Sequence, residues 1–189
     1  MFYYIQTWWR WFWRCGLSRG FGVQSPSAYS FIRYVINEHY PYYAYDELKR
    51  KLPTLGRQQH KFGRLLLRLA NYWQPEYRYS NITIYDRYLY AGCHKTNSDD
   101  LGNLVKSETK KLIVIDVRLF DFEYLIRSVL PLCNEHTLLV LLGLNKLHDK
   151  QLWNDLKASD YTGITYNLYY IGIVFFDKSV YKQHYNVNF

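Results

Sequence analysis

With 189 residues, the chain is long enough for one well-packed α/β domain and too short for two of ordinary size. Hydrophobic residues make up 49% and supply a core, while aromatic residues reach 20%, which favours broad contact surfaces. The formal net charge of +8 permits nucleic acid or an anionic membrane as a partner, although a solvated basic surface is the commoner outcome.

The cysteines and histidines indicate no disulfide framework and no metal site. Cys15, Cys93 and Cys133 are far apart and form no CxxC pair, so we expect a reducing, cytoplasmic location. Cys93 and His94 are adjacent, and adjacent side chains of a strand point to opposite faces, so they rarely share a metal. No apolar run approaches the roughly 18 residues of a membrane-spanning helix, and the N-terminus lacks the apolar centre of a signal peptide.

The first segment, residues 2–15, predicts a short helix with aromatic side chains on nearly every side. Three interpretations stay open: the helix covers its own domain, it contacts a protein partner or a second copy in a homodimer, or it lies in a membrane interface. In the last, Arg10 and Arg14 would face lipid headgroups. Stacking aromatics beside basic residues also suit nucleic acid, but the chain shows no recognisable module, so we do not expect that partner.

The next segments predict helices and a boundary. Gly20-Phe-Gly22 follows no strand, so we interpret it as a turn and not as a phosphate loop. Ser25 followed by Pro26 is typical of a helix start. Residues 59–73 form the clearest amphipathic helix, with Lys61, Arg64 and Arg68 expected on its solvated face. We therefore predict an N-terminal aromatic helical segment over 1–58 and a second domain over 59–189.

The second domain begins with weaker signals and continues with a regular α/β pattern. We predict extended segments at 82–86 and 88–91 and a weak helix from Asn97 to about Ser107. Lys111 to Val117 contains four consecutive aliphatics, which is typical of a central parallel strand buried on both faces. The later elements are a helix over 120–129 ended by Pro131, a buried strand at 137–142, a helix at 150–158, and antiparallel strands at 164–168 and 169–176.

This order predicts a mostly parallel sheet with one reversed strand. In such sheets ligands bind beyond the carboxyl ends of the strands, which is where Asp116 lies.

Several segments together resemble one known family. They are Gly22-Val-Gln-Ser-Pro26, Pro41-Tyr-Tyr-Ala-Tyr-Asp-Glu47, Lys61-Phe-Gly-Arg-Leu-Leu-Leu-Arg-Leu-Ala-Asn-Tyr-Trp-Gln-Pro75, Tyr169-Tyr-Ile-Gly-Ile-Val-Phe-Phe176 and Lys182-Gln-His184. The chain is similar to a bacterial family of class I S-adenosylmethionine-dependent methyltransferases, small Rossmann-like proteins of the O-methyltransferase type. The resemblance implies a three-layer Rossmann-like sheet with a C-terminal antiparallel strand, here truncated, and S-adenosylmethionine as the cofactor.

The chain departs from the family where the cofactor should bind. The family pattern resembles Glu-Leu-Gly-Thr-Ser-x-Gly after the first strand, but Tyr77 to Tyr90 contains no glycine that would let the backbone approach a ligand. Ala91 stands before Gly92 where family members resemble Glu-Gly, and Val117-Arg-Leu119 replaces Gly-Asn-His after Asp116. Gly143-Leu-Asn-Lys146 stands where family members resemble Asp-Asp-Ile-His.

Two functions therefore compete. The first is a degenerate methyltransferase-like protein without catalysis, kept as an interaction or scaffold domain, with Asp116 as a structural cap or ion-pair partner. The second is a working transferase in which Asp86 or Asp116 and backbone groups near Gly92 hold S-adenosylmethionine in an altered pocket. The sequence assigns no catalytic residue to either.

Overall fold

The computed structural model describes residues 23–95, 97–98, 108–119, 125–145 and 147–189. The aromatic segment 2–15, most of the helix expected from Asn97 and the first part of the helix expected at 120–129 lie outside these residues.

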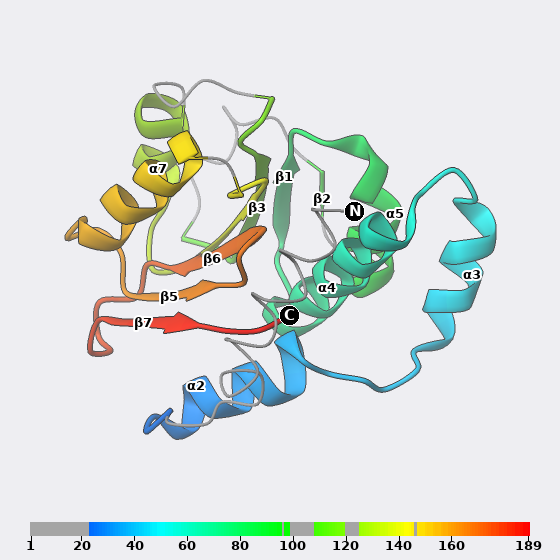
Figure 1. Cartoon of the computed structure of the whole chain (residues 1–189), viewed down its shortest axis with the longest axis horizontal. Helices are drawn as coiled ribbons and strands as arrows, with labels where there is room; N and C mark the ends of the chain where they lie inside the picture. Colours follow the sequence, from blue (N-terminus) through cyan, green and yellow to red (C-terminus); the bar gives the residue numbers. More distant parts are fainter. Residues whose placement is uncertain (1–22, 96, 99–107, 120–124, 146) are drawn as a thin grey trace.

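A seven-stranded sheet forms the centre of the molecule (Figure 1). Its order is β2-β1-β3-β4-β6-β5-β7, and every neighbouring pair is parallel except those that include β6. The strands are β1 (Tyr77–Ser80), β2 (Asn97–Ser98), β3 (Lys111–Asp116), β4 (Thr137–Leu142), β5 (Ile164–Asn167), β6 (Ile171–Phe175) and β7 (Gln183–Asn186). The predicted α/β fold, with a mostly parallel sheet and one reversed strand, is confirmed.

Helices cover both faces of the sheet, so the fold has three layers (Figure 1). Along β3, Leu112 and Val114 point to one hydrophobic cluster, and Ile113 and Ile115 point to the other, as the two-residue period of a strand requires. The first face carries α2 (Pro26–Phe31), η2 (Ile32–Ile36), α3 (Tyr43–Lys51), α4 (Arg57–Trp73), η3 (Thr83–Tyr85) and α5 (Asp86–Gly92). The second carries η5 (Leu125–Val129) and α7 (Leu147–Ala158), with the short η6 (Leu130–Leu132) beside them.

Several predicted elements are confirmed. All six residues of β3 and all six of β4 are buried. The Ser25 hydroxyl caps α2 by accepting a hydrogen bond from the Ala28 amide, 3.4 Å away, and Pro26 stands at the first helical position. Strands β5 and β6 are antiparallel and adjacent, as their short connection predicted.

The extended segments predicted at 82–86 and 88–91 are wrong. Strand β1 lies earlier, at 77–80, and the chain then turns through η3 into the helix α5. Tyr85, Tyr88, Leu89 and Gly92 are buried, and their spacing of three, four and seven residues is helical. Aromatic residues such as these prefer strands, but the packing of this segment on α4 favours a helix.

Two further expectations need correction. Asn97 begins the short strand β2 and not a helix. Arg68, which we expected on the solvated face of α4, is only 6% exposed. Its guanidinium donates to the carbonyls of Val35 and Ile36 and to the Tyr45 hydroxyl, so it joins α4 to the preceding helices.

Candidate functional site

The order of the strands defines where a doubly wound sheet would bind a ligand. From β1 the chain goes to β2 on one side and then returns to β3 on the other, so the strand order reverses between β1 and β3. In open α/β sheets the ligand crevice lies at this reversal, beyond the carboxyl ends of the two strands. These ends are Ser80 of β1 and Asp116 of β3.

The side chain of Asn81 links the two strand ends. Its amide nitrogen donates to the main-chain carbonyl of Asp116 over 3.1 Å, and its amide oxygen accepts from the Asp116 main-chain N–H over 2.8 Å. The Asn81 main-chain N–H donates to the carbonyl of Val114. Asn81 therefore continues the hydrogen bonding between β1 and β3 beyond the end of β1. In a binding crevice, the two strands separate at this position.

The carboxylate of Asp116 is held by Arg118. The side chain of Asp116 is 2% exposed and accepts from the Arg118 main-chain N–H at 3.0 Å, from its Nε at 2.8 Å and from its Nη2 at 2.5 Å. A Cβ at Gly143, where φ is +92°, would lie 2.9 Å from Arg118 Cγ. Arg118 thus extends across the end of β4. The prediction that Asp116 is an ion-pair partner is confirmed.

Tyr85 fills space beside this ion pair. It is 3% exposed, and burial, followed by the negative charge of Asp116, raises the pKa of its phenol to about 12. Within the described part of the chain, the crevice between β1 and β3 is therefore occupied by Asn81, Tyr85 and the Asp116–Arg118 pair. None of these four side chains lines the groove described next.

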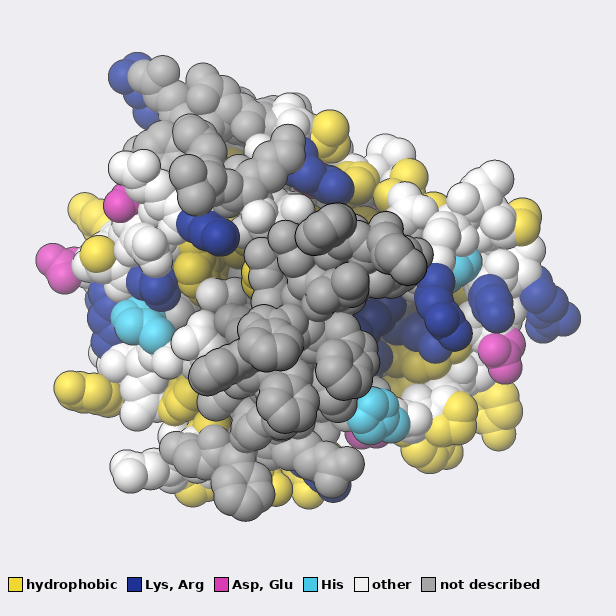
Figure 2. All heavy atoms as spheres, viewed as in Figure 1, with side chains coloured by type: hydrophobic (Ala, Val, Ile, Leu, Met, Phe, Trp, Pro, Cys, Tyr) yellow, Lys and Arg dark blue, Asp and Glu magenta, His cyan; other side chains and the backbone are white. Residues whose placement is uncertain are grey.

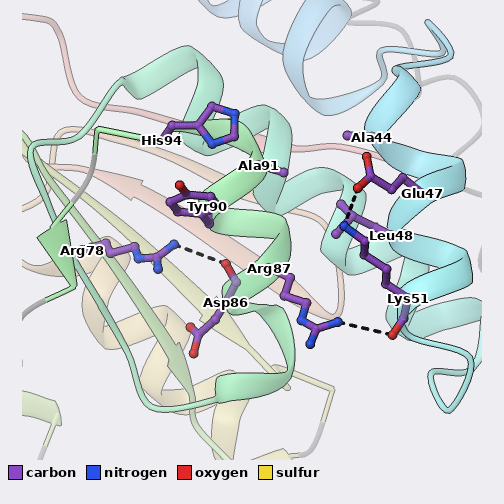
Figure 3. A pocket seen from close by; sticks show the side chains of 10 residues that line it. All are labelled: Ala44, Glu47, Leu48, Lys51, Arg78, Asp86, Arg87, Tyr90, Ala91 and His94. Atoms are coloured by element: carbon purple, nitrogen blue, oxygen red, sulfur yellow. Dashed lines mark hydrogen bonds and ion pairs between the residues drawn. The ribbon is translucent and has the colours of Figure 1, made fainter.

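A second hollow, the α3–α5 groove, lies between those two helices (Figure 3). Its volume is about 750 Å³, within the range of small-molecule sites. Its lining comes from α3, β1, α5 and the turn after α5, and consists of Ala44, Glu47, Leu48, Lys51, Arg78, Asp86, Arg87, Tyr90, Ala91 and His94. Arg87, Tyr90 and Ala91 follow helical spacing, so the groove faces one stripe of α5 while the opposite stripe is buried, and His94 lies in the turn after the helix.

Two guanidinium groups of the groove are positioned by main-chain carbonyls. Arg78 Nη1 donates to the carbonyl of Asp86 over 3.3 Å, and Arg87 Nη1 donates to the carbonyl of Lys51 over 3.4 Å. Figure 3 shows the Asp86 carboxylate on the opposite side of its residue from this contact. Desolvation raises the pKa of Asp86, and the positive charge of Arg78 lowers that pKa by a smaller amount. The remaining cation, Lys51, pairs with Glu47 at 2.5 Å.

The three predicted cofactor residues lie in different environments. Asp86 lines the α3–α5 groove, and Asp116 lies buried at the end of β3. Gly92 ends the helix α5 and not a strand, and a Cβ there would lie 2.2 Å from the Leu67 carbonyl oxygen. Gly92 therefore serves the close approach of α5 to α4, and the structure does not bring the three residues together.

Sequence reasoning missed Asn81 and the groove residues Arg78 and Arg87. The signal for Arg87 was the helical period in 85–92, which separates a buried stripe from a groove-facing stripe. Once this segment was interpreted as extended, neither stripe was visible.

Other chemistry is limited in the described residues. No group of three potential metal ligands lies together among them. His60 is 8% exposed, and its Nδ1 lies 2.6 Å from the Tyr88 hydroxyl. Desolvation, followed by the charge of Arg64, lowers the pKa of His60. No helix among the residues described is both long and apolar enough to cross a membrane.

The fold defines a doubly wound α/β protein. No family model matches the chain, and no curated protein matches its sequence. Among solved structures, the chain is similar to a methyltransferase from Geobacter sulfurreducens, with 13% identity and a TM-score of 0.41. The match covers 74% of this chain and 93% of that one. A likeness at this score carries no argument about cofactor or activity.

Proposed function

We propose that this chain is a degenerate methyltransferase-like protein, truncated and without catalysis, that acts as an interaction or scaffold domain. The observation that carries the proposal is the closed crevice between β1 and β3. Asn81 bonds both strand ends there, and Arg118 pairs with the carboxylate of Asp116, the last residue of β3. A ligand at this place would have to displace a partly buried, hydrogen-bonded network, at a cost of roughly 1–3 kcal/mol for each buried polar group left unpaired.

The second candidate is a working transferase with an altered pocket. One observation favours it: Asp86, one of the predicted cofactor residues, lines the α3–α5 groove, which is large enough for a nucleoside. In this case the Asp86 carboxylate would accept hydrogen bonds from ribose hydroxyls, the role that an acidic residue has in dinucleotide-binding sheets.

Calorimetric titration of the full chain with S-adenosylmethionine and S-adenosylhomocysteine separates the two candidates. The degenerate protein gives no binding heat at millimolar ligand. The working transferase binds at micromolar concentration, and Asp86→Asn weakens that binding at least tenfold. Asp46→Asn, on the N-terminal turn of α3 and outside the groove lining, is the control. Micromolar binding that Asp86→Asn abolishes and Asp46→Asn preserves would replace the first candidate with the second.

For an interaction domain, we propose the aromatic segment 2–15 as the contact to a protein partner or to a second copy of the chain. Its support is compositional, because large amphipathic side chains are enriched at protein interfaces. Sedimentation equilibrium of the full chain and of a variant with Trp8, Trp9 and Trp11 replaced by Ser tests the homodimer. Cosedimentation with anionic vesicles at low and high salt tests peripheral membrane contact, which salt should weaken. If the Trp-to-Ser variant self-associates and binds vesicles as the parent chain does, segment 2–15 is not the contact surface.

A further inference from the structure

The α3–α5 groove is lined by both apolar and positively charged side chains. Ala44, Leu48 and Ala91 give it apolar surface, while Arg78 and Arg87 reach it from β1 and α5 (Figure 3). A mostly apolar hollow with a few polar groups is typical of sites for small organic ligands. Figure 2 shows further basic side chains gathered over α3, which carries Lys49, Arg50 and Lys51 in its last turn.

Each of the two arginines is held by one hydrogen bond to a main-chain carbonyl, and neither is neutralised by an ion pair among the described residues. Arg78 Nε, shielded from solvent, has no hydrogen-bond partner in the described structure. A guanidinium that is held in place but not neutralised retains N–H groups in the fork geometry that binds phosphate or carboxylate oxygens.

The total charge of the groove selects the sign of the ligand. The lining contains three cations, Lys51, Arg78 and Arg87, and two carboxylates, Glu47 and Asp86. Because Lys51 and Glu47 pair with each other, two guanidinium groups face one carboxylate whose pKa is raised by desolvation. The groove therefore carries an excess of positive charge. This excess disfavours a sulfonium cofactor and favours an anion.

The rim of the groove offers aromatic rings. Tyr90 and His94 lie edge to face, with ring centroids 4.8 Å apart, and 52% of Tyr90 is exposed. An exposed aromatic ring that packs against a neighbouring ring can still offer its free face to a flat ligand ring.

From these observations we propose that the α3–α5 groove binds a small aromatic anion, whose phosphate or carboxylate group is attracted by the positive charge of Arg78 and Arg87 and whose ring lies against Tyr90. The proposal goes beyond the interaction function and does not depend on it, since the groove lies apart from the closed crevice and from residues 2–15.

The test is a titration of the ¹⁵N-labelled full chain with phenyl phosphate, followed by NMR. We expect shifts at the amides of Arg87, Tyr90 and His94 and a dissociation constant in the millimolar range or tighter. Inorganic phosphate, which lacks the ring, should bind about tenfold more weakly. Arg87→Gln and Arg78→Gln should each weaken phenyl phosphate binding about tenfold, because each removes a charged donor.

Lys178→Gln is the matched control, because it removes one exposed positive charge far along the chain, between β6 and β7. Arg87 is itself exposed, so its variant keeps the proposal testable if Arg78→Gln fails to fold. Three results would overturn the proposal: no shifts at millimolar phenyl phosphate, equal affinity for inorganic phosphate, or equal weakening by Lys178→Gln and Arg87→Gln. The phenyl phosphate titration does not depend on the S-adenosylmethionine titration, so each proposal can fail without the other.

Discussion

The guanidinium of Arg68 lies inside the protein and makes hydrogen bonds of 2.6 Å and 2.9 Å to the carbonyls of Val35 and Ile36. These two residues end the π-helical η2, whose last carbonyls have no partner of their own within the helix. A third hydrogen bond, to the Tyr45 hydroxyl at 3.0 Å, reaches α3. One side chain of α4 thus holds two preceding elements.

Replacement of Arg68 by Met should therefore lower the free energy of unfolding by about 2–4 kcal/mol, because two buried carbonyls lose a charged donor. Arg57→Met, at an exposed position on the same helix, should change it by less than about 0.5 kcal/mol. Urea unfolding of the two variants checks the difference. Equal losses would mean that Arg68 contributes no more than a surface residue.

At the scale of elements, α4 and α5 approach each other closely because Gly92 has no side chain. A Cβ at this position would lie 2.2 Å from the Leu67 carbonyl oxygen and 2.8 Å from the Ala70 Cβ. Backbone atoms cannot move aside as a flexible side chain can. Any larger residue must therefore push the two helices apart.

Gly92→Ala should destabilise the protein by about 1–3 kcal/mol, the usual effect of overpacking. Arg87→Ala, on the exposed stripe of the same helix, is the control and should leave stability nearly unchanged. The midpoints of urea unfolding give the comparison. A Gly92→Ala midpoint equal to that of the parent would show that the helices separate without cost.

The sequence predicted some elements of this fold and not others. Strands β3 and β4 were predictable, because uninterrupted aliphatic runs buried on both faces leave no other arrangement. The helix α5 was not, because its tyrosines prefer strands locally and only their packing on α4 selects the helical period. Strand β7 is short and polar, and it is specified by parallel pairing with β5 and by Tyr185 stacking on Tyr166.

The candidate site was predictable only in part. Asp116 as an ion-pair partner followed from its position at the end of β3 and from the missing glycine after it. Its partner Arg118 and the bridging Asn81 are contacts between segments 35 residues apart or across a tight turn, and no local pattern encodes them. The role of Gly92 was misassigned because a glycine in sequence does not reveal whether a ligand or another helix approaches it.

At the scale of the whole molecule, the described residues before 59 share one hydrophobic cluster with α4 and the sheet. Phe31 packs against Tyr166 and Phe175, and Leu48 of α3 belongs to the same cluster. The boundary at residue 58 stays a prediction. The shared cluster makes α2, η2 and α3 part of the layer that covers one face.

The many tyrosines of this layer affect how stability depends on pH. Burial raises the pKa of Tyr85 to about 12 and also raises the pKa values of Tyr88 and Tyr166 above their ordinary value of 10.0. Burial likewise raises the pKa of Cys133 from 9.0 to about 12. Each of these groups keeps its proton in the folded state at a pH where the unfolded chain has lost it.

Stability should therefore fall as the pH rises above about 9, since the unfolded state then binds fewer protons than the folded state. Desolvation lowers the pKa of Lys61 and Lys111 and works in the opposite direction, but these two lysines are outnumbered. The measurement is the urea midpoint between about pH 8 and pH 11, with tyrosinate absorbance recorded in parallel. We expect the buried tyrosines to ionise only together with unfolding. Ionisation of all tyrosines near pH 10 in a chain that stays folded would show that this aromatic layer is open to water, and the raised pKa values would then be wrong.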